Sequence, residues 1–341
     1  MDVSTIPVDL NASNPDQTSV GDLTYLGGLE IAEGANRIGG ISGLEWADGQ
    51  LVALTDDGRW LKLTLTEESD RLIGIASGET GRLLNENGKA LEGKLEADSE
   101  SLARSRDGNW LVGFERNHRI LIYSDLAAIA GADDFAIVSL VDNVEPNKGL
   151  EALAVTDRGL IACGEWAGSE TPNCMREEDD ALIAFELTAP FPLNERRGFP
   201  TDIDCASNGD CYVLFRSYTK AYGNSAAIIS INGDFQVGTI ATFLPPLALD
   251  NFEGLTVRED GDRTFLYIAS DNNFSPNQRT LLMKFEIGAD RPSLPAQSSA
   301  EEAAKDSPII VTGKIDESDE LAVRLGSRIK KKPRFTNLTV A

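Results

Sequence analysis

The chain has 341 residues, of which 31 are lysine or arginine and 55 are aspartate or glutamate, so its formal charge is −24. A surface this acidic repels a phosphate backbone, which argues against nucleic acid as a partner. The 41 % share of hydrophobic residues is typical of a folded globular protein. No stretch approaches the roughly 18 to 20 consecutive apolar residues of a membrane-spanning helix, so we expect no membrane span.

Residues 1–20 are predicted to form an N-terminal extension. They contain no basic start followed by an apolar block, so we expect that any secretory leader has been removed from this chain. The next segment, from Asp22 to Ile31, has the composition of a β-strand, and we expect it to pair with the last of the repeats that follow.

Five segments share one pattern, in which a short apolar strand is followed by a polar turn and a second apolar strand that ends in a charged residue. The first matching positions of the five are Ser42, Glu100, Glu151, Asp202 and Glu253, separated by 58, 51, 51 and 51 residues. A period of about 50 residues built from short strands and Asp-Gly or Asn-Gly turns is typical of the blades of a β-propeller.

The sequence therefore predicts an all-β protein in which residues 21–288 form a β-propeller with four-stranded antiparallel blades. The five motifs favour five blades, and six would require a degenerate unit hidden in the 58-residue interval or at the N-terminus. The early strand would complete the last blade and close the ring. Residues 289–341, rich in small and charged residues, are predicted to form a flexible or loosely docked tail.

Four cysteines form two local pairs, Cys163 with Cys174 and Cys205 with Cys211, each flanking a polar loop. Both spacings allow a disulfide, which would place the protein in an oxidising compartment, periplasmic or secreted. Zinc is the competing interpretation, but neither pair has C-x-x-C spacing and the chain contains one histidine. Four buried thiols in a cytoplasmic protein are the remaining alternative.

Propeller geometry brings acidic side chains of distant repeats to one mouth of the central channel, because the first strand of every blade lines that channel. Glu100, Glu151, Asp202 and Glu253 form the first predicted ring. The second predicted ring follows the next strand and contains Asp56, Glu115, Glu165, Arg216 and Asp271. Like charges so close together are unfavourable unless something offsets their repulsion.

Three kinds of offset are compatible with these residues. A hard cation could neutralise several carboxylates, and with one histidine in the chain, oxygen-bound Ca²⁺ or, second, Mg²⁺ is the expected ion. Alternatively, nearby arginines and lysines pair with the acids in a structural network. In the third case the acids accept hydrogen bonds from backbone amides of neighbouring blades and hold the blades together.

Arg216 is the one cation in an otherwise acidic ring. It would orient an anionic group together with Arg116 and Lys148, or else form an internal salt bridge to Glu165 or Asp271.

His118 is a candidate acid or base near neutral pH, and its alternative role is that of a surface or hydrogen-bonding residue. The chain lacks a G-x-S-x-G elbow, a P-loop and an H-E-x-x-H motif. A carboxylate base or a metal-activated water is therefore the more economical route to ester hydrolysis.

The motifs around the repeats are more specific than the period alone. Asp250-Asn-Phe-Glu-Gly-Leu-Thr-Val with Leu266-Tyr-Ile-Ala-Ser-Asp-Asn-Asn-Phe resembles the closing segment of the phytase-like family with esterase-like activity, and the earlier units are similar to the rest of that family in the same order, over residues 22–288. The resemblance implies a bacterial, usually exported β-propeller that hydrolyses phosphate or other esters. Ser101 and Ala152 replace glycines of the family pattern, which would narrow the approach of a ligand to the backbone.

The resulting hypothesis is metal-assisted hydrolysis of a small anionic ester, in particular a phosphoester, and the alternative is a non-catalytic propeller that binds a ligand or a protein partner. The predicted catalytic residues are Glu151, Glu165 and His118. The predicted substrate-binding residues are Arg116, Lys148, Arg216 and Asn272. The predicted metal ligands are Glu100, Glu115, Glu253 and Asp271, of which several follow from the family resemblance.

Overall fold

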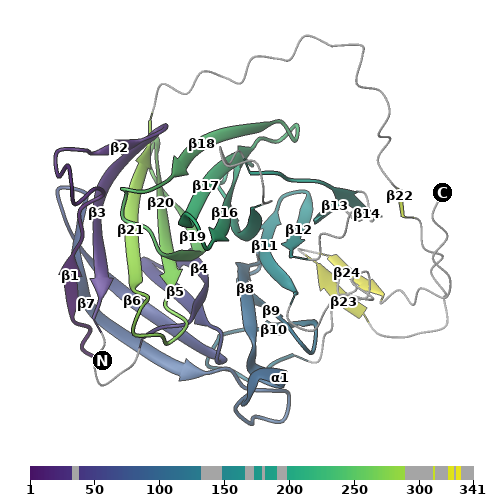
Figure 1. Ribbon diagram of the computed structural model, residues 1–341. Helices are drawn as coiled ribbons and strands as arrows, with labels where there is room; N and C mark the ends of the chain where they lie inside the picture. The colour runs from purple at the N-terminus through teal and green to yellow at the C-terminus, as the bar shows by residue number, and fades with distance from the viewer. Residues whose placement is uncertain are drawn as a thin grey trace, which may run out of the picture.

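The computed structural model describes residues 1–32, 38–131, 148–165, 173–178, 181–189 and 198–288, together with three short strands between 310 and 331. Five antiparallel sheets stand around a common axis (Figure 1), and we number these blades 1 to 5 in chain order of their inner strands. The all-β propeller predicted from the repeats is therefore confirmed, with five blades and not six.

The inner strand of each blade contacts the inner strands of its two neighbours, so these five strands surround the channel. They are β4 (Ile41–Ala47), β8 (Ser99–Arg104), β11 (Leu150–Thr156), β15 (Phe199–Cys205) and β19 (Asn251–Asp260). We call the end of the channel at which these strands begin the channel mouth, and the opposite end the far face.

The outer strands follow in chain order within each blade, with the helix α1 (Lys94–Ala97) between blades 1 and 2. Blade 1 adds β5 (Gln50–Thr55), β6 (Arg59–Glu68) and β7 (Arg71–Arg82); blade 2 adds β9 (Trp110–Phe114) and β10 (Arg119–Tyr123); blade 3 adds β12 (Gly159–Gly164), β13 (Cys174–Glu178) and β14 (Ala181–Phe185); blade 4 adds β16 (Cys211–Thr219), β17 (Gly223–Ile231) and β18 (Val237–Phe243); blade 5 adds β20 (Arg263–Asp271) and β21 (Thr280–Ile287). Of the three strands after residue 288, β22 (Ile310–Val311) pairs with β14, and β23 (Ala322–Leu325) pairs with β24 (Arg328–Lys331).

Within the described residues, blade 2 holds three strands where four were predicted. Gly131 forms an isolated antiparallel bridge with Ile122 of β10, on the side where a fourth strand would pair. Residues 132–147, which follow Gly131, lie outside the described part of the chain.

The N-terminal strand β3 (Leu23–Ile31) closes the ring, as predicted. It pairs antiparallel with β21 from Leu23↔Ile287 to Ile31↔Thr280, and thus becomes the fourth strand of blade 5. Figure 1 shows β3, in purple, beside the green β21. Two shorter strands, β1 (Thr5–Pro7) and β2 (Ser19–Val20), pair in turn with β3. Closure by the first segment of the chain covers the edge of β21 that would otherwise be exposed.

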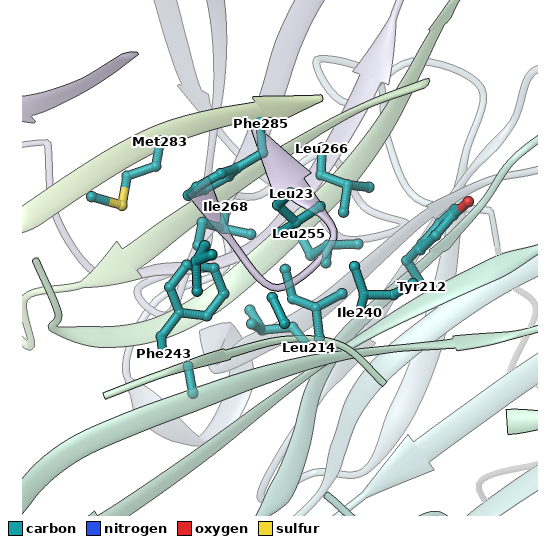
Figure 2. Packing of buried hydrophobic residues seen from close by; sticks show 14 of the residues in the cluster. Leu23, Tyr212, Leu214, Ile240, Phe243, Leu255, Leu266, Ile268, Met283 and Phe285 are labelled. Carbon is teal, nitrogen blue, oxygen red and sulfur yellow. The ribbon is translucent and has the colours of Figure 1, made fainter. Parts of the chain in front are cut away.

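Apolar side chains fill the spaces between neighbouring blades. Figure 2 shows the cluster between blades 4 and 5, where Leu214 and Phe243 of blade 4 meet Leu255, Ile268 and Phe285 of blade 5, all of them almost completely buried. Side chains alternate between the two faces of a strand, so the alternating apolar residues of each repeat pack into such an interblade core.

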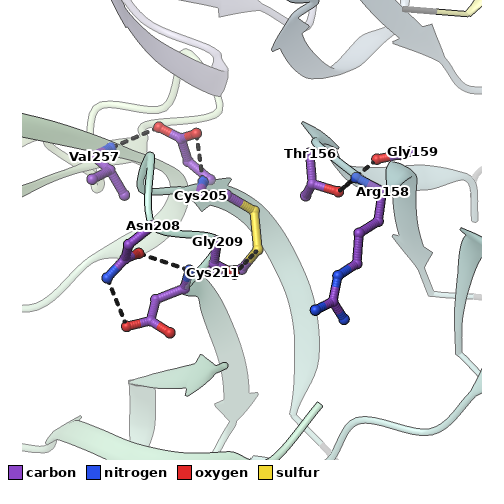
Figure 3. Close-up of a disulfide and its surroundings, with 10 residues drawn as sticks. Thr156, Arg158, Gly159, Cys205, Asn208, Gly209, Cys211 and Val257 are labelled. Atoms are coloured by element: carbon purple, nitrogen blue, oxygen red, sulfur yellow. Dashed lines mark hydrogen bonds between the residues drawn. A yellow bond between two sulfur atoms is a disulfide. The ribbon is translucent and has the colours of Figure 1, made fainter. Parts of the chain in front are cut away.

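Both predicted disulfides are present. Cys163 and Cys174 are cross-strand partners on β12 and β13, and Cys205 and Cys211 close the β15–β16 hairpin (Figure 3). Two disulfides satisfy all four cysteines, which removes the zinc and free-thiol alternatives. In the part of the chain that the structure describes, no helix has the length and apolar character needed to cross a membrane.

Candidate active site

A β-bulge at the start of every inner strand decides which side chains face the channel mouth. In each blade the pairing with the second strand skips one residue at this point, and the skipped residues are Ser42, Glu100, Glu151, Thr201 and Glu253. The structure therefore corrects the sequence alignment of the fourth repeat by one residue, since Thr201 and not Asp202 is the equivalent of the three glutamates. A bulge re-aims a side chain in this way because the extra residue has no partner in the ladder.

The five bulge residues divide into two types. The hydroxyls of Ser42 and Thr201 donate hydrogen bonds to the backbone carbonyls of Ser99 (2.6 Å) and Phe252 (3.2 Å), each on the next blade. These two positions join neighbouring blades. The three glutamates instead bring carboxylates from blades 2, 3 and 5 to the channel mouth.

Acids of the two rings lie close enough to perturb one another. Burial raises the pKa of Glu100 well above its usual range, and the negative charges of Glu151 and Glu253 raise it further. Burial also raises the pKa of Glu253, to about 8, and that of Asp271, to about 6. The convergence predicted from the repeats is thus present, and carboxyl groups from different blades interact across one opening.

Glu115 and Glu151 form a pair of carboxyl groups in direct contact. Both are buried, and their side chains are hydrogen-bonded to each other. Burial and the charge of Glu115 raise the pKa of Glu151, while the amide of Gly149 donates to Glu115. Two carboxyl groups in such contact cannot both be ionised without a large penalty, so the contact favours a state in which the pair holds one proton.

One group of carboxylates has the spacing of metal ligands. Oxygen atoms of Asp98, Glu100 and Glu115 lie within 4.8 Å of one another. Asp98 was missed as a site residue, although it opens the Asp98-Ser-Glu-Ser motif of the second repeat. Two of the predicted ligands, Glu253 and Asp271, are not members of this group, which the described residues of blade 2 form alone.

Cations of the same region already have carboxylate partners. Lys94 on α1 bridges Asp56 (2.6 Å) and Asp98 (2.7 Å), and Nε of Arg116 lies 2.5 Å from the other oxygen of Asp98. The second oxygen of Asp56, Oδ1, is buried and has no hydrogen-bond partner within the described residues. Burial raises the pKa of Asp56, and Lys94 opposes this shift.

Arg216 joins blade 4 to the acids of blades 3 and 5. Its guanidinium lies 3.2 Å from Glu253 and 3.6 Å from Glu165, and it donates to the amide oxygen of Asn251 at 2.6 Å. The salt bridge to Glu165 that the sequence offered as one alternative is present, and its second carboxylate partner is Glu253 rather than Asp271. Arg216 thereby offsets part of the negative charge of the mouth.

The other predicted site residues lie at the rim of the mouth. Oδ1 of Asn272 accepts hydrogen bonds from the amides of Gly40 (3.2 Å) and Phe274 (3.0 Å), which ties the end of β20 to the start of blade 1. His118 packs against Gly149, next to the half-buried Lys148. Nε2 of His118 is buried and has no hydrogen-bond partner among the described residues.

Asp202 accepts hydrogen bonds from backbone amides of other blades, which is one of the roles that the sequence allowed for the acids. It is fully buried, and its Oδ2 accepts hydrogen bonds from the amides of Leu255 (2.7 Å) and Leu44 (3.2 Å), while Oδ1 accepts from Ile203. This one carboxylate therefore connects the inner strands of blades 4, 5 and 1.

Comparison with known proteins identifies a family by sequence pattern. The sequence model of the phytase-like family, described as esterase-like activity of phytase, matches residues 36–274. No curated protein sequence matches the chain.

Two of the solved structures that match the chain are compared with it by identity, coverage and TM-score. A PQQ-bound aldose sugar dehydrogenase from Streptomyces coelicolor is 14 % identical, with coverage of 79 % of this chain and 99 % of the other and a TM-score of 0.42. A gluconolactonase from Xanthomonas campestris is 13 % identical, with coverage of 83 % and 97 % and a TM-score of 0.39. Similarity at this level says nothing about the substrate of this chain.

Proposed function

Because the chain belongs to the phytase-like family, whose description is esterase-like activity, we propose that it hydrolyses an ester at the carboxylate-lined channel mouth. The observation that carries this proposal is the buried Glu115–Glu151 pair. Carboxyl groups with raised pKa values concentrate at catalytic sites, because a shared proton makes one of them an acid and the other a base near neutral pH.

In this mechanism the ionised member of the Glu115–Glu151 pair accepts a proton from the attacking water, and the protonated member donates one to the leaving alkoxide. His118, whose Nε2 lacks a partner in the described structure, is available beside Gly149 for the same proton transfers. Glu165 acts indirectly, since its ion pair with Arg216 holds the guanidinium at the mouth.

The donor set of Asp98, Glu100 and Glu115 fits Ca²⁺, which prefers carboxylate oxygens and tolerates irregular geometry. A bound Ca²⁺ would polarise the ester oxygen and offset the negative charge of the mouth. Acids outnumber the cations Lys94, Arg116 and Arg216 there, so we expect an anionic ester such as a phosphoester to bind only together with a divalent cation.

A second candidate function is that of a non-catalytic propeller that binds a ligand or a protein. The ion pairs of Arg216 and Lys94 and the backbone hydrogen bonds of Asp202 favour it, because these groups already have partners within the protein. In this reading the acidic rings hold the blades together.

We also propose that the protein functions outside the cytoplasm, in the periplasm or as a secreted protein. The support is the pair of disulfides, since such bonds persist in oxidising compartments.

Glu151→Gln provides the test of catalysis. The substitution keeps the shape of the side chain but removes the shared proton, so we expect hydrolysis to fall by about 100-fold or more. The measurement is initial rate on a panel of phosphate and carboxylic esters with Ca²⁺, Mg²⁺ or EDTA.

Glu79→Gln, an exposed glutamate of blade 1, is the matched control and should leave every rate unchanged. Equal rates in Glu151→Gln and the unmodified protein would reject the site. A phosphoester that is hydrolysed equally fast in EDTA would reject the role of the cation while leaving the acid–base pair in place.

A further inference from the structure

A cavity of about 190 Å³ lies between blades 3 and 4 on the far face, at the opposite end of the strands from the acidic mouth. Three hairpin turns border it, those of β11–β12, β15–β16 and β17–β18. Figure 3 shows two of these turns, with Arg158 extending from the first and the Cys205–Cys211 disulfide closing the second. None of the residues assigned to the channel mouth contributes to the cavity.

The inner part of the cavity is apolar. Ile161 and Ile231 line it together with Cys211, and all three belong to the hydrophobic core between blades 3 and 4. Phe235 forms another wall, packed edge-on against Phe185 at 5.7 Å between ring centroids. Such a surface favours a ligand with an apolar body.

Two guanidinium groups supply polar contacts at the same cavity. Arg176 stacks over the ring of Phe235 at 3.6 Å, and its buried Nε has no hydrogen-bond partner in the described structure. Arg158 donates to the carbonyl of Gly233 and forms no ion pair with any described carboxylate. Unused guanidinium donors beside a cavity are suited to a carboxylate, which accepts two parallel hydrogen bonds.

The acidic residues of the lining do not cancel this preference, because they already have partners. Asp157 pairs with Arg106 of blade 2, and Glu178 pairs with Arg176 at 2.6 Å through Nη2. Glu177 is also engaged. The free part of the Arg158 guanidinium thus remains for a ligand, and Arg176 adds positive charge to the cavity wall.

The backbone at Phe235 is unusual in a way that points to this cavity. Its φ is +60°, a left-handed conformation that costs a bulky residue roughly 1–2 kcal/mol and normally selects glycine or asparagine. Here the aromatic ring is retained, and it forms both the platform for Arg176 and one wall of the cavity. Strain of this kind is characteristic of binding sites.

We propose that the cavity binds a small carboxylate with an apolar or aromatic body. The carboxylate is held by Arg158 and Arg176, and the body lies on Ile161, Ile231 and Phe235. This site is independent of the ester hydrolysis proposed for the channel mouth.

Phenylacetate is the probe, and its binding is measured by calorimetry and by saturation-transfer NMR. We expect saturable binding at one site, about tenfold weaker for benzyl alcohol, which lacks the carboxylate, and about tenfold weaker for inorganic phosphate, which lacks the apolar body. Arg176→Gln and Arg158→Gln should each weaken phenylacetate binding about tenfold. Phe235→Gly, which suits the left-handed backbone, should fold and lose most of the affinity.

Lys89→Gln, which removes an exposed cation far from the cavity, is the matched control and should bind the probe normally. Arg158 lies in an exposed turn, so its substitution decides the matter if Arg176→Gln fails to fold. Absence of saturable binding, equal binding of phosphate, or unchanged affinity in Arg158→Gln would overturn the proposal. Glu151→Gln should bind phenylacetate normally, so failure here and failure of the hydrolase proposal are separable.

Discussion

Glu253 and Asp271 of blade 5 link the chemistry of the mouth to the stability of the protein. Burial raises the pKa of Glu253 to about 8 and that of Asp271 to about 6, whereas an unfolded chain titrates such groups near 4. Between these values the folded state binds more protons than the unfolded state. The free energy of unfolding is therefore highest, as far as these groups contribute, below about pH 4, and it declines as the pH rises toward 8.

We expect the free energy of unfolding in EDTA to fall by at least about 1 kcal/mol between pH 5 and pH 8, because one unit of pKa shift corresponds to about 1.4 kcal/mol. Urea unfolding at several pH values measures this slope. Glu253→Gln should flatten it, and Glu79→Gln should not. If the free energy of unfolding of the unmodified protein rose between pH 5 and pH 8, the raised pKa values given for Glu253 and Asp271 would be contradicted.

The same residue-level repulsion explains why the mouth is a candidate for both catalysis and metal binding. A proton on the Glu115–Glu151 pair and a cation near Asp98 are two ways to relieve one accumulation of negative charge. Arg216 is a third, already present in the protein.

At the scale of the element, the inner strands are held together by side chains that accept or donate across blades. Asp202 reaches Leu44 and Leu255, and its neighbour Asp204 accepts from the amide of Val257 at 2.7 Å. Ser42 and Thr201 extend the pattern through their hydroxyls. The propeller is therefore joined near its axis by polar contacts as well as by the apolar cores between blades.

Asp202→Asn should destabilise the protein by about 1–3 kcal/mol, because both side-chain oxygens of Asp202 accept backbone hydrogen bonds and the substitution leaves a buried N–H donor without an acceptor. Either orientation of the asparagine amide places an N–H group against a backbone N–H donor. Urea denaturation gives the change in free energy of unfolding. The control is Asp262→Asn in the exposed β19–β20 turn, which should have almost no effect; equal stability of the two variants would refute the role given to Asp202.

At the scale of the whole molecule, closure of the ring depends on the first part of the chain and not on the last. The strand β3 has nine residues and pairs with β21 along its length, and its residues Leu23, Tyr25, Leu29 and Ile31 are buried. The described pairing of the C-terminal segment with the blades is confined to the two residues of β22.

Removal of residues 289–341 should therefore change the melting temperature by no more than about 2 °C. Removal of residues 1–32 should abolish cooperative unfolding, since it exposes the edge of β21 and opens the core between blades 4 and 5. Circular dichroism melts of both truncations distinguish these outcomes. A large loss of stability on removal of the C-terminal segment would show that the propeller does not end near residue 288.

Several features of this protein follow from the sequence alone. The 51-residue spacing of Glu100, Glu151 and later motifs determines the propeller, because each repeat is one blade and neighbouring blades bury one another's apolar faces. The cysteine spacing predicts both disulfides, since each pair is local, and the structure removes the zinc and free-thiol alternatives. The sequence pattern also located the ends of several second strands, since Asp56, Glu115 and Glu165 directly follow β5, β9 and β12, whereas Arg216 lies within β16.

Other features were decided only by the tertiary structure. The equivalent position in the fourth repeat is Thr201 and not Asp202 because of a β-bulge, and the pattern of apolar residues does not predict where a bulge occurs. The partners of Arg216 and the cavity beside Phe235 join segments of different repeats. Spacing along a chain defines the strands, but the distance between two side chains in separate blades exists only after the ring has closed.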